Sequence, residues 1–86
     1  MPVISYFFGI YIRMYFDDHA PPHFHVAHGE GRAQVRIDPP GLLSGELSPR
    51  ALALVVEWAA LHRSELMANW RRVQDRQPTE KIDPLR

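Results

Sequence analysis

Residues 23–37 read HFHVAHGEGRAQVRI, and this stretch decides the fold. Apolar and polar side chains alternate on both sides of the Gly29–Gly31 turn, as in strands that are buried on one face. We therefore predict a β-hairpin of His23–His28 and Arg32–Ile37. One face of this hairpin carries apolar side chains and the other carries His, Gln and Arg, so only one face needs a cover.

The residues before the hairpin predict two further strands, Val3–Phe8 and Ile10–Phe16, which are rich in β-branched and aromatic side chains. Gly9 joins them, and a glycine inside such a run indicates a bulge or a tight corner. After the hairpin, Leu42–Leu47 is compatible with a short edge strand or with a bend. The predicted sheet therefore has about four strands and spans residues 3–38.

A helix is predicted from about residue 49 to about residue 75. Ser48 is a good N-cap and Pro49 suits the first helical position, because its missing N–H has no partner there in any case. A break near His62–Ser64 is left open. Residues 76–86 contain further prolines and are predicted to form an extended tail.

One stripe of apolar side chains at helical spacing is expected to cover the sheet. It comprises Leu52, Val55, Val56, Ala59, Leu66, Trp70 and Val73. The matching strand residues are Ile10, Ile12, Met14, Phe16, Phe24, Val26, Ala33, Val35 and Ile37. The predicted fold class is therefore α+β: one domain over residues 1–86, a two-layer sandwich of a mostly antiparallel sheet on one long C-terminal helix.

A second apolar stripe on the same helix consists of Leu54, Trp58 and Leu61. A two-layer domain of this size buries one stripe against its own sheet. Either the tail or Leu42–Leu47 covers the second stripe, or the stripe is an interface with a second copy or a small partner protein. Tryptophan flanked by leucine is typical of interface hot spots, so these residues are the interface candidates.

Composition excludes several classes of protein. The chain has 86 residues, a formal net charge of zero and no cysteine. Disulfide scaffolds, cysteine zinc sites and thiol catalysis are thus excluded. No apolar run reaches the roughly 18–20 residues that span a bilayer, so no membrane contact and a cytoplasmic location are expected. Because a general basic excess is lacking, any nucleic-acid site must be a local patch.

Histidines gather in one short segment. His23 and His25 are two residues apart on a predicted strand and project from one face, and a rigid proline pair could bring His19 beside them. Three imidazoles suit a divalent, zinc-like transition metal with water in an open position. Asp17 or Asp18 would be a further ligand or its hydrogen-bond partner. The alternative is that these histidines only bond backbone groups of the loop.

The uncovered face of the predicted sheet offers a second candidate site. Its nucleic-acid-binding candidates are Tyr11, Arg13, Tyr15, Gln34 and Arg36, beside the histidines. Tyrosine rings can stack on bases, and arginine can hold phosphate, so the face could bind or cleave RNA. The alternative is an ordinary solvated strand face, since exposed positions are polar anyway.

Four motifs carry a resemblance to a known family. They are Phe8-Gly9-Ile10-x-Ile12-x-Met14-Tyr15, His19-x-Pro21-Pro22-His23-Phe24-His25-Val26, Gly45-x-Leu47-x-x-Arg50-Ala51-Leu52 and Glu57-Trp58-Ala59-x-Leu61-His62-Arg63. From about Pro2 to Leu85 the chain resembles the small bacterial domain-of-unknown-function family numbered forty-one sixty. That resemblance implies a short protein that is often encoded beside a second small protein, as in toxin–antitoxin-like pairs. It implies no catalytic residue.

The function predicted first is an accessory or regulatory protein that associates with itself or with a small partner, and a non-enzymatic role is favoured. The first alternative is an RNA-binding or RNA-cleaving module that uses the uncovered sheet face. The second alternative is a metal-binding protein with a histidine site.

Overall fold

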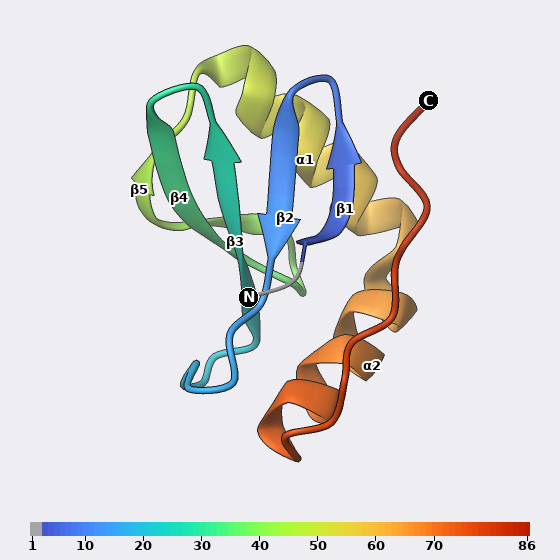
Figure 1. Ribbon diagram of the computed structural model, residues 1–86. Helices are drawn as coiled ribbons and strands as arrows, with labels where there is room; N and C mark the ends of the chain where they lie inside the picture. Colours follow the sequence, from blue (N-terminus) through green and yellow to red (C-terminus); the bar gives the residue numbers. More distant parts are fainter. Residues whose placement is uncertain (1–2) are drawn as a thin grey trace.

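Over residues 3–86, which the computed structural model describes, the chain forms a sheet of five strands and two helices (Figure 1). The strands are β1 (Val3–Phe7), β2 (Ile10–Arg13), β3 (His23–His28), β4 (Gly31–Arg36) and β5 (Gly41–Glu46), and the helices are α1 (Pro49–Leu61) and α2 (Arg63–Gln74). Every strand pairs with the next one along the chain in antiparallel direction. The α+β class and the antiparallel sheet are confirmed, and residues 1–2 of the predicted domain lie outside the described residues.

The sheet contains two tight hairpins: β1 with β2, whose connection at Gly9 was left open between a bulge and a tight corner, and the predicted hairpin of β3 with β4. In the first, β1 and β2 meet at Phe8 and Gly9, whose φ angles of 52° and 78° are both positive. Positive φ at both central residues is the backbone of a tight hairpin turn, and glycine adopts it without strain. In the second, His28 pairs with Gly31, so β3 and β4 turn through two residues. Of the two alternatives for Gly9, a bulge or a tight corner, the structure has the tight corner.

The strand count and one strand end differ from the prediction. Gly41–Glu46 is a fifth strand, and its side chains are largely exposed, so its sequence lacks the alternation that marks a half-buried strand. At Gly45, with φ +83°, a Cβ atom would lie 2.1 Å from the carbonyl oxygen of Arg32, so only glycine fits beside β4. Strand β2 ends at Arg13 rather than Phe16, because the chain turns where the Asp18 N–H donates to the Tyr15 carbonyl.

The predicted long helix is two helices. The start is as expected, since the Ser48 hydroxyl accepts a hydrogen bond from the Ala51 N–H at 3.1 Å and Pro49 follows it. The break falls at His62, whose φ of −120° and ψ of 27° leave the helical region. Its side chain bonds to Glu65 in the first turn of α2. The change of direction allows both helices to contribute to one core.

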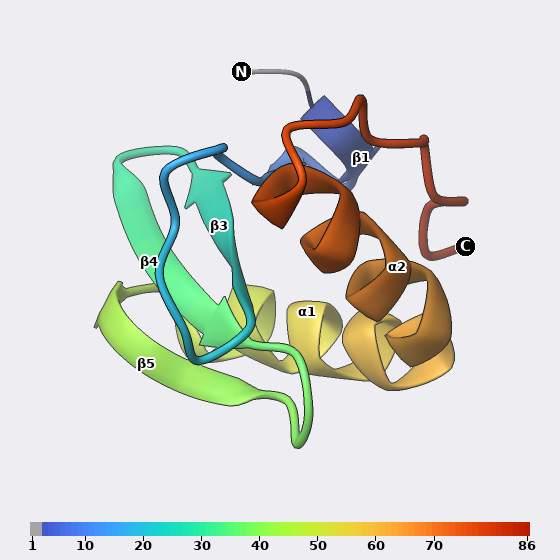
Figure 2. The same cartoon turned by 90° about the horizontal axis from the view of Figure 1, so that it is seen from below.

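The sheet curves, and the two helices lie on its inner side (Figure 2). Among the described residues the core contains most of the predicted apolar side chains: Ile10, Ile12, Met14, Phe24, Val26, Val35 and Ile37 from the sheet side, and Val55, Ala59, Leu66, Trp70 and Val73 from the helices. Ala33 is buried as well, whereas Val56 of the predicted stripe is only partly buried. Phe16 and Leu52 pack at its margin. Neither helix of the described chain is long and apolar enough to pass through a lipid bilayer.

The tail closes the domain over Trp58. Ile82 is buried, and its N–H donates to the Ile4 carbonyl at 2.8 Å while its own carbonyl accepts from the Ser5 hydroxyl. One residue further, the Asp83 carbonyl accepts a 2.8 Å hydrogen bond from the Trp58 indole N–H. In Figure 1 the tail runs upward beside α2 and β1. Its bonds to strand and helix make it part of the fold.

Candidate metal centre

The loop between β2 and β3 presents the carboxylate of Asp18 to the sheet. Its Oδ2 accepts a hydrogen bond from the Tyr15 N–H at 3.0 Å, while the Asp18 N–H donates to the Tyr15 carbonyl at 3.2 Å. The Gln74 amide, at the end of α2, donates to the Asp18 carbonyl at 3.0 Å. These contacts fix the loop, and they leave Oδ1 directed at β3.

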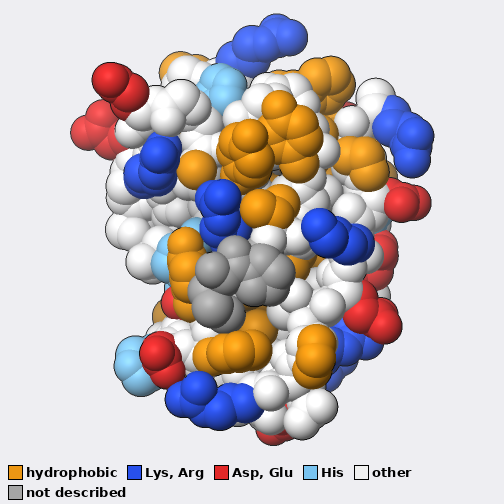
Figure 3. Space-filling model, in the orientation of Figure 1, with side chains coloured by type: hydrophobic (Ala, Val, Ile, Leu, Met, Phe, Trp, Pro, Cys, Tyr) orange, Lys and Arg blue, Asp and Glu red, His pale blue; other side chains and the backbone are white. Residues whose placement is uncertain are grey.

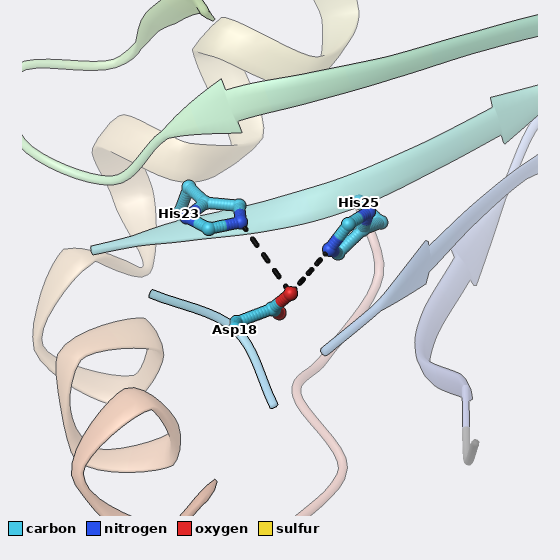
Figure 4. A group of neighbouring side chains, drawn as sticks. All are labelled: Asp18, His23 and His25. Atoms are coloured by element: carbon cyan, nitrogen blue, oxygen red, sulfur yellow. Dashed lines mark hydrogen bonds and ion pairs between the residues drawn. The ribbon is translucent and has the colours of Figure 1, made fainter. Parts of the chain in front are cut away.

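Two histidines of β3 face that oxygen (Figure 4). The Nε2 of His25 lies 2.9 Å from Asp18 Oδ1, and the Nε2 of His23 lies 3.6 Å from the same atom. The side chains are largely enclosed, with exposed fractions of 11% for Asp18, 7% for His23 and 24% for His25. Low exposure strengthens electrostatic attraction among them and toward any cation between them.

The ring of His23 is held in one orientation. Its Nδ1 lies 2.8 Å from the Pro21 carbonyl oxygen, which can only accept, so Nδ1 carries a proton and donates. The ring also packs on Trp70, with centroids 5.4 Å apart. In the neutral ring the lone pair therefore belongs to Nε2, which faces the Asp18 carboxylate. Metal-bound histidines commonly show this pattern, in which the other ring nitrogen donates to a backbone carbonyl.

The spacing of the three groups fits a small cation. His23 Nε2, His25 Nε2 and a carboxylate oxygen of Asp18 all lie within 4.8 Å of one another. With metal–ligand bonds of about 2.1 Å, neighbouring ligand atoms are about 3.0–3.4 Å apart, depending on geometry. The 2.9 Å and 3.6 Å separations to Asp18 Oδ1 bracket that range. Small side-chain shifts would thus complete a site with two nitrogens and one oxygen.

His19 does not join this group, although the sequence analysis included it. It is exposed on the loop, and Asp18 takes the place predicted for it. Asp17 is directed elsewhere and forms an ion pair with Arg76 at 3.1 Å. The strand spacing of His23 and His25 was sufficient to predict that they share a face. Asp18 had been predicted as a further ligand or hydrogen-bond partner, and its position in place of His19 depends on the turn at Tyr15–Asp18.

Two depressions flank the cluster. One, of about 260 Å³, lies over the sheet and includes His25, Arg13 and Tyr15 in its wall. The other, of about 310 Å³, lies beside the loop and includes Asp18 and His23. Gln34, which pairs with His25 across the sheet, lines both of them. A small molecule could therefore approach the three donor atoms from either side.

The nucleic-acid candidates lie on the sheet surface opposite the helices, called the open face below. Tyr11 is exposed, while Arg13, Tyr15, Gln34 and Arg36 are partly buried, and Arg36 also donates to the Pro39 carbonyl. Tyr6, which was not among the candidates, also lies on this face, pairs with Tyr11 and contacts its ring at 4.5 Å between centroids. Alternation along β1 was the pattern that could have placed Tyr6 on the open face. That alternation is interrupted by an irregularity between Val3 and Ser5.

The interface candidates do not form one exposed surface. Trp58 is fully buried, Leu54 is half-buried and Leu61 is 66% exposed. Phe7 and Phe24 pack on the Trp58 ring, with centroids 5.3 Å and 5.8 Å away. The tail covers Trp58, which was one of the two alternatives that the sequence left open. The His62 ring also packs on Trp58, with centroids 5.6 Å apart, and lies outside the Asp18 cluster.

No curated protein and no solved structure matches this chain. The family model described as Domain of unknown function (DUF4160) matches residues 9–71. This range includes Asp18, His23, His25 and the first helix in full, and it agrees with the resemblance carried by the sequence motifs. The chain therefore belongs to the family Domain of unknown function (DUF4160).

Proposed function

We propose that this protein binds one divalent transition-metal ion through Asp18, His23 and His25. The convergence of two imidazole nitrogens and one carboxylate oxygen within 4.8 Å carries the proposal. Nitrogen and carboxylate donors suit zinc and its neighbours in the first transition row. Three protein ligands leave at least one coordination position for water or a substrate, as in catalytic rather than structural metal sites.

The neighbours of the three ligands support the same proposal. Pro21 orients His23, and the Tyr15 N–H orients Asp18, so two of the ligands are fixed before a metal arrives. His25 Nε2 donates its proton to Asp18 when metal is absent. Binding requires the proton on Nε2 to move to Nδ1 of the same ring, so metal uptake replaces the hydrogen bond from His25 to Asp18.

Metal binding is tested with tag-free protein and zinc ions. Wild type is expected to take up about one equivalent of zinc. His25→Ala is expected to weaken binding by more than about 100-fold, which exceeds the loss from removing a residue that only hydrogen-bonds to a ligand. Asp18→Asn, which keeps the shape of the side chain, should also lose tight binding. Equilibrium dialysis followed by elemental analysis measures both.

His19→Ala is the matched control, because His19 is exposed, adjacent in sequence and outside the cluster. It should bind zinc as wild type does. Wild type without zinc above background would overturn the proposal, and so would an equal loss in His19→Ala and His25→Ala. In that case Asp18, His23 and His25 serve only to hold the loop on β3.

Association with a partner protein requires a different surface from the one first considered. Trp58, the central residue of the predicted Leu54, Trp58 and Leu61 interface, is buried, and of the three side chains only Leu61 is exposed. The toxin–antitoxin-like partner that the resemblance implies would therefore contact another face of the domain.

A further inference from the structure

The open face carries an exposed aromatic pair. Tyr6 and Tyr11 are 52% and 41% exposed, although each is flanked by a buried core residue of its own strand. Their rings are in contact, with centroids 4.5 Å apart and planes tilted by 42°, and the guanidinium of Arg13 lies 5.2 Å from the Tyr11 ring centroid. An exposed tyrosine ring with an adjacent arginine offers a face on which a further planar group can stack.

The open face is locally basic, although the chain has no net charge. Because Ala33 and Val35 are buried, the alternating Arg32, Gln34 and Arg36 project from the opposite side of β4. With Arg13 on β2, the open face carries three arginines. Two carboxylates lie beside them, since Glu46 pairs with Arg32 and Asp18 bonds to His25. In the view of Figure 3, basic side chains surround an apolar group on this side of the molecule. Such a local excess favours an anionic ligand.

A depression of about 260 Å³ lies over the strands that follow β1, and Tyr6 and Tyr11 are not part of its lining. Arg13, His25, Gln34 and Ser44 follow one another in register across β2, β3, β4 and β5, and all of them line it. Guanidinium, amide and hydroxyl groups can donate hydrogen bonds to a phosphate oxygen, while the Nε2 proton of His25 is already bonded to Asp18. Arg13 connects the two features, because it contacts Tyr11 and also lines the depression.

We propose that the open face binds single-stranded nucleic acid, with a base stacked on the Tyr6–Tyr11 pair and a backbone phosphate in the depression. Bases present flat π-faces to aromatic side chains, and a phosphate meets the row of donors that begins at Arg13. An apolar protein partner would leave that polar row without hydrogen-bond partners. The proposal goes beyond the metal centre and does not require a metal, although His25 belongs to both sites.

Binding is tested by fluorescence anisotropy with a labelled oligouridylate at low salt and with a chelator present. Tyr11→Ala is expected to weaken binding by about 5- to 150-fold, the range typical of losing one base–aromatic stack. Arg13→Ala should weaken binding and reduce the slope of log K against log salt by about 0.7, the value for one phosphate contact on a single strand. An oligodeoxyuridylate of equal length shows whether the 2′-hydroxyl contributes.

Arg50→Ala is the matched control, since Arg50 is exposed in the helical layer at the start of α1. It should bind as wild type does. Asp18→Asn should also retain binding, so that failure of the metal proposal and failure of this one give different results. Wild type that binds neither oligonucleotide at low salt overturns the proposal, as does Tyr11→Ala or Arg13→Ala with wild-type affinity. Binding of a protein partner that is lost in Tyr11→Ala, with no oligonucleotide bound, identifies the face as a protein interface instead.

Discussion

Replacing Trp58 with alanine is expected to lower the free energy of unfolding by about 3–5 kcal/mol, the range for deleting a buried aromatic side chain. The ring is fully buried between Phe7 and Phe24, and its N–H anchors the tail at the Asp83 carbonyl. Small domains have only about 5–15 kcal/mol of stability in total, so part of the variant would be unfolded at room temperature. Urea titration followed by circular dichroism measures the loss.

Leu61→Ala is the control for this prediction, because Leu61 lies on the same helix and is 66% exposed. Its effect should stay within about 0.5 kcal/mol, as for most surface substitutions. Trp58→Phe, which removes the N–H but keeps a ring, should fall between the two. An oligomer in wild type that Trp58→Ala dissociates without loss of protomer stability would contradict the burial of Trp58 and restore it as an interface residue.

Zinc is expected to stabilise the folded protein strongly. A ligand at 100 times its dissociation constant adds about 2.7 kcal/mol to the free energy of unfolding when it binds only the folded state. In a domain of this size that corresponds to a rise of about 10–20 °C in Tm. The rise should be absent in Asp18→Asn and preserved in His19→Ala. Thermal melts with zinc and with a chelator, followed by circular dichroism, measure it.

This second prediction separates a metal site from a structural cluster. If Asp18, His23 and His25 serve only to fix the loop, Asp18→Asn lowers the Tm equally with and without zinc. A rise of the same size in wild type, Asp18→Asn and His25→Ala would show that zinc binds elsewhere on the chain. Either result contradicts the proposed centre.

The sequence was sufficient to predict those parts of the fold that depend on local patterns. Alternation predicted the hairpin of β3 and β4, and Ser48 with Pro49 predicted the start of α1. Strand β5 was left ambiguous because an edge strand that is exposed on both faces shows no period. Burial of Trp58 depends on Ile82 and Asp83, which are more than twenty residues away and carry no local signal.

The candidate site, like the fold, was predictable where it depends on local spacing and not where it depends on tertiary contacts. The two-residue spacing of His23 and His25 places both imidazoles on one face wherever the strand lies. The third group depends on how the loop returns to the sheet, and that path is set by the bonds of Asp18 with Tyr15 and Gln74. His19 was a reasonable candidate by residue type, but its neighbour Asp18 has the required orientation. Tertiary contacts thus decided between two adjacent residues.

Nuclear magnetic resonance of ¹⁵N-labelled histidine side chains, recorded during a zinc titration, tests the central claim most directly. The chain has five histidines, so each ring can be followed separately. The Nε2 resonances of His23 and His25 should shift together and saturate at about one equivalent of zinc, while those of His19, His28 and His62 stay unchanged. A shift of His19 in place of His23, or no shift of any histidine at saturating zinc, would contradict the proposed metal centre.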